Sequence, residues 1–164
     1  MKKQPDFARL FREHFDTTPA KLMYQVRQDS NRMHDIVFLS SLIHDARFRR
    51  KDLVLRNKRL VIGVERDCWE LGMVDRADSK DIYLVQSRLI VSPVTEIKWG
   101  FAHGTDFAPE DELWIHDIWI ARQAIQPGEY ISLILGGFTW ECILTVHEPN
   151  MTVRLQDIDI PRKR

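Results

Sequence analysis

The longest helical repeat of apolar residues lies between Ser30 and Phe48. Apolar side chains recur there at steps of three and four residues, which is the period of one face of an α-helix: Met33, Ile36, Val37, Leu39, Ile43 and Ala46. Ser30, or Asp29 before it, can accept hydrogen bonds from the free N–H groups of a first helical turn. Phe38 and Leu42 widen the apolar stripe. We therefore expect a core helix that other elements cover on more than one side.

Two shorter helices are predicted before this one. Phe7, Leu10, Phe11 and Phe15 form an apolar stripe with charged residues between them, as in a short amphipathic helix. A second helix is predicted from Thr17-Thr18-Pro19 through Val26, because a hydroxyl suits the cap and Pro suits the first helical position. Its apolar residues are Leu22, Met23 and Val26. The pattern thus indicates two or three N-terminal helices.

The hydrophobic period changes to two near residue 50. Asp52–Leu55 and Leu60–Arg66 are rich in β-branched residues and flank the polar segment 56–59, which predicts a hairpin. The same criteria predict further strands at 82–91, 94–101, 113–121, 130–135, 138–146 and 151–160. We expect the last three to form an antiparallel meander, with Gly136-Gly137 as its first turn.

The order of these elements predicts an α+β fold. Helices come first and strands afterwards, so we expect two or three N-terminal helices packed on a curved, mainly antiparallel sheet of about seven to eight strands. The expected domain is a single one over 1–164, with a helical part at 1–48 and a β-rich part at 52–160. A chain of 164 residues with 44% hydrophobic residues is long enough to bury such a core.

Charge is distributed unevenly along the chain although the net charge is zero. Residues 1–60 hold 14 Lys and Arg against 7 Asp and Glu, and residues 61–164 hold 10 against 17. Positive charge in residues 1–60 is most concentrated in the basic cluster, which we define as Arg47, Arg49, Arg50, Lys51 and Arg56. The acidic half is sharpest in the acidic segment, residues 106–117. Either can be a partner surface, or the two can face one another.

The cysteines and the apolar runs indicate a cytoplasmic protein. Cys68 and Cys142 form no CxxC or Cys/His cluster, so we expect reduced thiols rather than a disulfide or a metal site. No apolar run has the length of a signal peptide core or of a membrane span. We therefore expect no membrane partner.

The sequence lacks the common catalytic and cofactor motifs. It has no phosphate-binding glycine loop, no GxSxG elbow and no HExxH helix, and we predict no cofactor and no metal from such motifs. The candidate catalytic residues are two His-Asp pairs, His44-Asp45 and His116-Asp117. If the strand with the second pair crosses the end of the helix with the first, the four side chains suit a divalent metal or acid/base chemistry. A metal-dependent hydrolase is therefore one alternative, and simple capping of the helix end by His44 and Asp45 is the other.

Nucleic-acid binding through residues 47–59 is a further alternative. Clustered Lys and Arg bind phosphates, and neighbouring aromatic residues such as Phe48 can stack on bases. The sequence pI of about 7.0 and the acidic half argue against such a partner.

The function that we favour from the sequence is a non-catalytic protein-interaction or regulatory module. Trp114 and Trp119 would point to opposite faces of one strand, so one of them is expected outside the core. Exposed aromatic residues beside charged ones are typical of contact surfaces, and we include both tryptophans and the basic cluster in the expected binding surface. The partner is another protein or a second copy, since the apolar run 131–135 also fits a homodimer. The alternative is that both sheet faces are covered, one by the central helix and the other by a second sheet or by a dimer mate.

Overall fold

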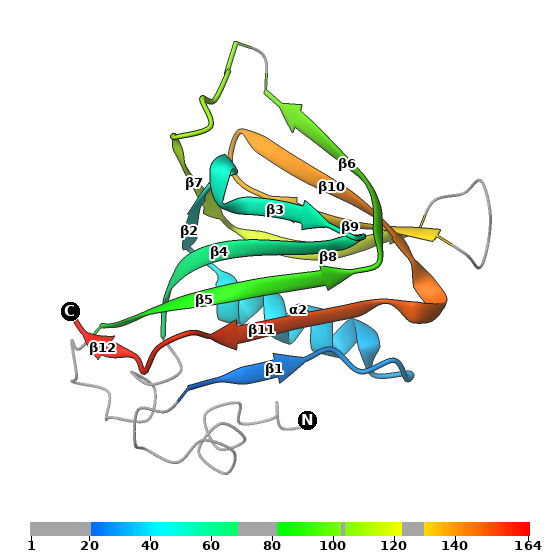
Figure 1. The fold of residues 1–164 in the computed structure, drawn as a ribbon, viewed down its shortest axis with the longest axis horizontal. Coiled ribbons are helices and arrows are strands. Elements are labelled where there is room, and N and C mark those ends of the chain that lie inside the picture. Colours follow the sequence, from blue (N-terminus) through cyan, green and yellow to red (C-terminus); the bar gives the residue numbers. More distant parts are fainter. Residues whose placement is uncertain (1–20, 69–81, 103, 123–129) are drawn as a thin grey trace, which may run out of the picture.

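A computed structural model of the chain describes residues 21–68, 82–102, 104–122 and 130–164 (Figure 1). The described residues are mostly β and contain one α-helix, α2 at Arg32–Ile43. The strands are β1 Met23–Gln25, β2 Ala46–Arg49, β3 Leu53–Arg56, β4 Arg59–Asp67, β5 Tyr83–Ser92, β6 Val94–Phe101, β7 Glu112–Ile115, β8 Asp117–Arg122, β9 Tyr130–Gly136, β10 Trp140–His147, β11 Thr152–Asp157 and β12 Arg162–Lys163. Two short 3-10 turns are η1 at Arg50–Asp52 and η2 at Glu148–Asn150.

The strands form two antiparallel sheets, and this overturns the predicted fold class. The large sheet has eight strands in the order β1-β11-β5-β4-β2-β7, with β12 paired to β5 and β3 paired to β4. The small sheet has the order β6-β10-β9-β8. The prediction of two or three helices on one sheet of seven to eight strands was therefore wrong. Among the described residues a single helix packs against two sheets.

The core lies between the two sheets and α2. Alternate residues of β4 and β5 are buried on the same side as Ile36, Leu39, Leu42 and Ile43 of the helix. In Figure 1, α2 (cyan) lies behind β5 and β11, and the small sheet rises behind β3 and β4. The chain passes from one sheet to the other four times. It does so between β5 and β6 at Pro93, between β6 and β7, between β7 and β8 at His116, and between β10 and β11 through η2.

The predicted helix at 30–48 ends earlier than its apolar pattern suggests. After Ile43 the chain turns at Asp45, which has a φ of 62°, and Ala46–Arg49 is strand β2. Ala46 and Phe48 are buried on one face of β2. Two buried residues spaced by two positions fit one face of a strand. They also lay within the apolar segment that predicted the helix, so the apolar pattern alone did not distinguish a helix from a strand here.

The second predicted helix is also corrected. Residues 23–25 form β1, which pairs with β11, so the helix predicted to run from Thr17 through Val26 is wrong for the part that the structure describes. The pairing continues past β1, since the Asp157 N–H donates to the Leu22 carbonyl at 2.8 Å. The helix predicted at 7–15 lies outside the described residues.

The predicted strand 113–121 is two strands in different sheets. β7 pairs with β2 in the large sheet, whereas β8 pairs with β9 in the small sheet, and His116 is the residue between them. The C-terminal meander was also wrong in its last step. β9 and β10 form the expected hairpin, but β11 pairs with β5 and β1, because η2 carries the chain across to the large sheet.

The hairpin predicted around residues 56–59 is confirmed. β3 pairs with β4 in a register that places Arg56 opposite Arg59. Asn57 and Lys58 both have positive φ, 51° and 61°. Two successive positive-φ residues are the mark of the hairpin turn that matches the twist of its strands.

A fully buried ion pair crosses the large sheet. The guanidinium of Arg66 on β4 lies 3.1–3.2 Å from both carboxylate oxygens of Asp157 on β11, and neither side chain is exposed. The same carboxylate accepts hydrogen bonds from the Ser87 hydroxyl at 2.6 Å and from the Leu22 N–H at 2.9 Å. Buried charges persist where they are paired and hydrogen-bonded in this way.

Candidate functional site

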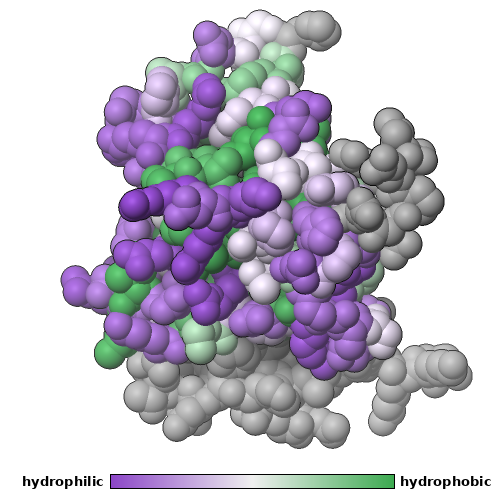
Figure 2. Space-filling view, turned by 45° about the vertical axis from the view of Figure 1, so that its right-hand side comes forward, coloured by the Kyte–Doolittle hydropathy of each residue, from purple (hydrophilic) through white to green (hydrophobic). Residues whose placement is uncertain are grey.

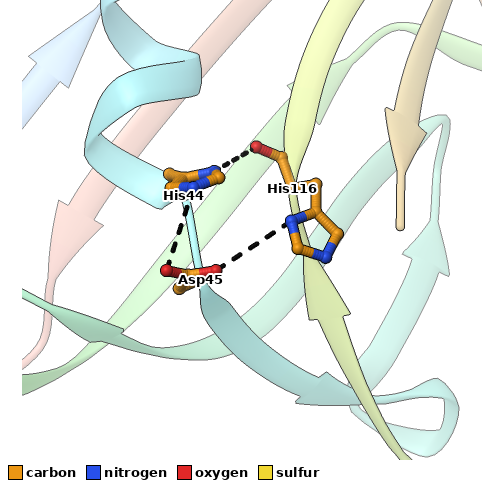
Figure 3. Close-up of side chains that lie close together, drawn as sticks. All are labelled: His44, Asp45 and His116. Carbon is orange, nitrogen blue, oxygen red and sulfur yellow. Dashed lines mark hydrogen bonds and ion pairs between the residues drawn. The ribbon is translucent and has the colours of Figure 1, made fainter. Parts of the chain in front are cut away.

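Three of the four predicted catalytic candidates lie together where the chain crosses between the sheets. His44 and Asp45 follow α2, and His116 joins β7 to β8 (Figure 3). One possible ligand atom from each residue lies within 4.8 Å of the other two. Asp117 is not part of this cluster. It is the first residue of β8, where successive side chains point to opposite faces of the sheet.

The backbone around Asp45 holds the cluster in place. Its N–H donates to the carbonyl of Ile115 at 2.8 Å, and the next residue, Ala46, pairs with Ile115 in the β2–β7 ladder. The φ of 62° is one that few residues with a side chain adopt, and Asp and Asn tolerate it better than most. The carboxylate of Asp45 is therefore fixed beside the residue that follows Ile115, which is His116.

Each imidazole has a defined orientation. The Nδ1–H of His44 donates to the His116 carbonyl at 2.5 Å, so its Nε2 faces Asp45, with 3.8 Å between Nε2 and Oδ2. The Nδ1 of His116 lies 4.0 Å from Oδ1 of the same carboxylate. The ring of His116 packs against Phe138, with 3.7 Å between ring centroids, and against His44 at 5.6 Å. The buried Nε2 of His116 has no hydrogen-bond partner in the part of the chain that the structure describes.

Three exposed aromatic residues are near this cluster in space or along the chain, and we call them the aromatic surface: Trp114, Trp119 and Phe138. Phe138 packs on His116, the Trp119 ring lies beside Gly136, and Trp114 is two residues before His116. Their exposed fractions are 45%, 38% and 88%. The two tryptophans precede and follow His116 on β7 and β8, so they lie on different strands and not on opposite faces of one. Phe138 lies in the link between β9 and β10. Sequence reasoning missed Phe138, and the only signal available was an aromatic residue next to the glycine pair.

The predicted glycine turn at Gly136-Gly137 has a different physical basis from the expected one. Neither glycine has a positive φ. A side chain at Gly137 would instead place its Cβ 2.1 Å from the Trp140 indole nitrogen and 2.8 Å from the Trp114 carbonyl. Close packing of Trp140 beneath the link, rather than backbone freedom, therefore requires glycine here.

The basic cluster is largely engaged within the molecule. Arg47 lies 2.7 Å from the Glu65 carboxylate and 5.4 Å from the centroid of the Trp114 ring. Arg50 donates to the Phe107 carbonyl at 2.9 Å and lies 4.9 Å from the centroid of the Trp99 ring.

The acidic segment meets the basic cluster directly. Lys51 and Glu110 form an ion pair at 2.5 Å, and the Lys51 N–H donates to the Pro109 carbonyl. The two charged regions thus face one another at this point, which was one of the two alternatives from the sequence. Arg49 and Arg56 remain exposed.

The large sheet also has a groove that the sequence did not suggest. Its volume is about 690 Å³, and its lining includes Val54, Arg59, Val61, Gly63, Arg88 and Ile90. Figure 2, a space-filling view, shows apolar side chains (green) interrupted and bordered by hydrophilic ones (purple) on one face of the molecule. The lining of the groove combines apolar and charged residues.

No protein-family model, curated protein or solved structure matches this chain. Among the described residues no helix has the length and apolar character needed to cross a membrane.

Proposed function

We propose that the protein is a non-catalytic interaction module that contacts another protein, or a second copy of itself, through the aromatic surface around His116. The observation that carries this proposal is Phe138, which is 88% exposed although its ring packs against His116. Burying a phenylalanine side chain is worth about 1.5–3 kcal/mol, so a ring that is oriented but uncovered favours a partner. Trp114 and Trp119 supply the residue type that most often dominates binding energy.

The other functions considered from the sequence have less support. The hydrolase was expected to use four groups, and Asp117 is not in the cluster that the other three form. Nucleic-acid binding needed a free basic surface, and Arg47, Arg50 and Lys51 are instead occupied by acidic or carbonyl groups of the same chain.

Self-association is the first test of the aromatic surface. We expect sedimentation velocity to show a concentration-dependent dimer that Phe138→Ser weakens. Val54→Ser is the matched control, because Val54 is also an exposed apolar residue, 55% exposed, but lies on β3. The control variant should sediment as the wild type does.

A photo-crosslinking experiment covers a partner other than self. A benzoylphenylalanine at position 138 should crosslink a defined protein in cells that produce the chain, and Trp119→Ser should reduce that product. The same label at position 54 should not give it. Equal crosslinking at the two positions, together with unchanged sedimentation of Phe138→Ser, would contradict the proposal.

A further inference from the structure

We propose that His44, Asp45 and His116 bind a divalent transition-metal ion of the zinc type. This site lies within the surface proposed above, but metal binding by the isolated chain does not require any partner. The two proposals can therefore fail separately.

The spacing of the three side chains suits an ion better than direct hydrogen bonds. The imidazole nitrogens lie 3.8 Å and 4.0 Å from the Asp45 oxygens, beyond hydrogen-bond distance. Two ligands on a tetrahedral zinc ion, each at about 2.1 Å, are roughly 3.4 Å apart. Small side-chain rotations would therefore bring His44, Asp45 and His116 onto one ion.

The hydrogen bond of His44 also prepares it as a ligand. Its Nδ1–H donates to the His116 carbonyl, so in the neutral ring Nε2 carries the lone pair, and that lone pair faces a carboxylate. Two acceptors that face each other repel unless a cation lies between them. Metal-bound histidines very often donate their other N–H to a carbonyl or carboxylate in this way.

The donor set indicates the class of metal. Two imidazoles and one carboxylate suit zinc and its first-row neighbours, whereas magnesium and calcium prefer oxygen ligands. About half of the side-chain surface of His44 and of Asp45 is exposed, 54% and 46%. A fourth position would therefore be open to water or to a side chain of a partner.

An ion here would connect two distant parts of the chain. His44 and Asp45 join α2 to β2, and His116 joins the large sheet to the small sheet. The metal would thus tie the end of the helix to the crossing between the sheets. It would also hold the His116 ring on which Phe138 packs.

The test is titration of the tag-free, metal-stripped chain with zinc in a calorimeter, and with cobalt followed by its visible absorption. We expect one equivalent to bind, with magnesium failing to compete. His116→Ala and Asp45→Asn should each weaken binding by at least about a hundredfold, the upper range for losing even an outer partner of a metal ligand. Asn is chosen because it also tolerates the positive φ at this position.

His34→Ala is the matched control, since His34 is an exposed histidine at the other end of α2. Its zinc affinity should equal that of the wild type. Absence of zinc binding, or equal losses in His34→Ala and His116→Ala, would overturn the assignment. Circular dichroism confirms that each variant is folded, so a lost affinity is not mistaken for a lost fold. Dimer formation is measured separately on the metal-stripped chain with Phe138→Ser, so a failure of one proposal is distinguishable from a failure of the other.

Discussion

Replacing Asp157 by alanine should destabilise the protein more than any single change at an exposed ion pair. The change removes the carboxylate that the buried Arg66 guanidinium contacts at 3.1–3.2 Å. It also removes the acceptor of the Ser87 hydroxyl and of the Leu22 N–H. The guanidinium, the hydroxyl and the N–H would each lose this hydrogen-bond acceptor. The Arg66 charge would then be buried without its carboxylate, because neither charged side chain is exposed to water.

The expected loss is about 3–5 kcal/mol in the free energy of unfolding, the range for removing one partner of a buried ion pair. Whole domains are stable by only about 5–15 kcal/mol, so this is a large share. For a chain of this size each kcal/mol lowers Tm by about 2–4 °C, which gives a fall of roughly 6–20 °C.

Urea unfolding followed by circular dichroism measures this change. The urea concentration at the midpoint should fall, while the dependence of the unfolding free energy on urea concentration stays the same. Glu96→Ala is the control, because Glu96 and Lys98 form an ion pair at 3.2 Å in which both side chains are more than half exposed. That variant should lose no more than about 1 kcal/mol.

A double-mutant cycle isolates the interaction itself. Arg66→Met removes the charge that Asp157→Ala leaves behind. The double variant should therefore lose less free energy of unfolding than the two single variants lose in sum, by about 0.5–3 kcal/mol. Additive losses, or a loss at Asp157 no larger than at Glu96, would refute the reasoning.

Three further predictions follow from the ionisable groups. Burial, and after it the hydrogen bond and charge of Asp35, raises the pKa of Tyr24 from 10.0 to about 12. The contribution of the neutral Tyr24 side chain to the stability of the fold is therefore complete below about pH 10 and is lost as the pH rises through about 12. Tyr24→Phe should flatten this alkaline loss in urea titrations at a series of pH values. The hydrogen bond from Arg27 lowers the pKa of Asp35 below its ordinary 3.8, so its contribution is present at neutral pH and lost as pH falls through the lowered value. Asp35→Asn should reduce the pH dependence of stability in that acid range, and an unchanged acid titration would contradict this. Burial raises the pKa of the Cys142 thiol to about 12, so a disulfide reagent should label it in urea and only very slowly in the native protein.

The local parts of the fold were predictable from the sequence. The β3–β4 hairpin depends on a turn of two residues and on alternation within about ten, and all of that information lies in one short segment. The helix was found for the same reason, although its end was not. Ala46 and Phe48 satisfy the helical and the strand pattern equally, and only pairing with β7, far along the chain, decides between them.

The large-scale arrangement depended on pairings that no local pattern contains. The run from Leu113 to Ala121 is apolar on both faces, so nothing in it shows that its two halves belong to different sheets. The residues before β11 likewise do not show that this strand leaves β10 and joins β5. Each of these choices is made by contacts with segments that lie dozens of residues away.

The sequence predicted which residues could form the candidate site but not how they are arranged in space. His-Asp pairs stand out in any reading of the chain, and the meeting of two of them was conditional on a strand crossing the helix end. The β2–β7 ladder produces that meeting for His44, Asp45 and His116, which lie up to 72 residues apart. The separation of Asp117 follows from the alternation of side chains along β8, which applies only once the start of that strand is known.

The repeated passage of the chain between the sheets restricts how the molecule can open. β5 continues into β6, and β7 continues into β8, so each sheet contains strands whose covalent neighbours belong to the other. One sheet therefore cannot unfold without disturbing strands of the other. We expect the backbone amides of β4, β5, β9 and β10 to exchange their hydrogens together, through global unfolding of the molecule.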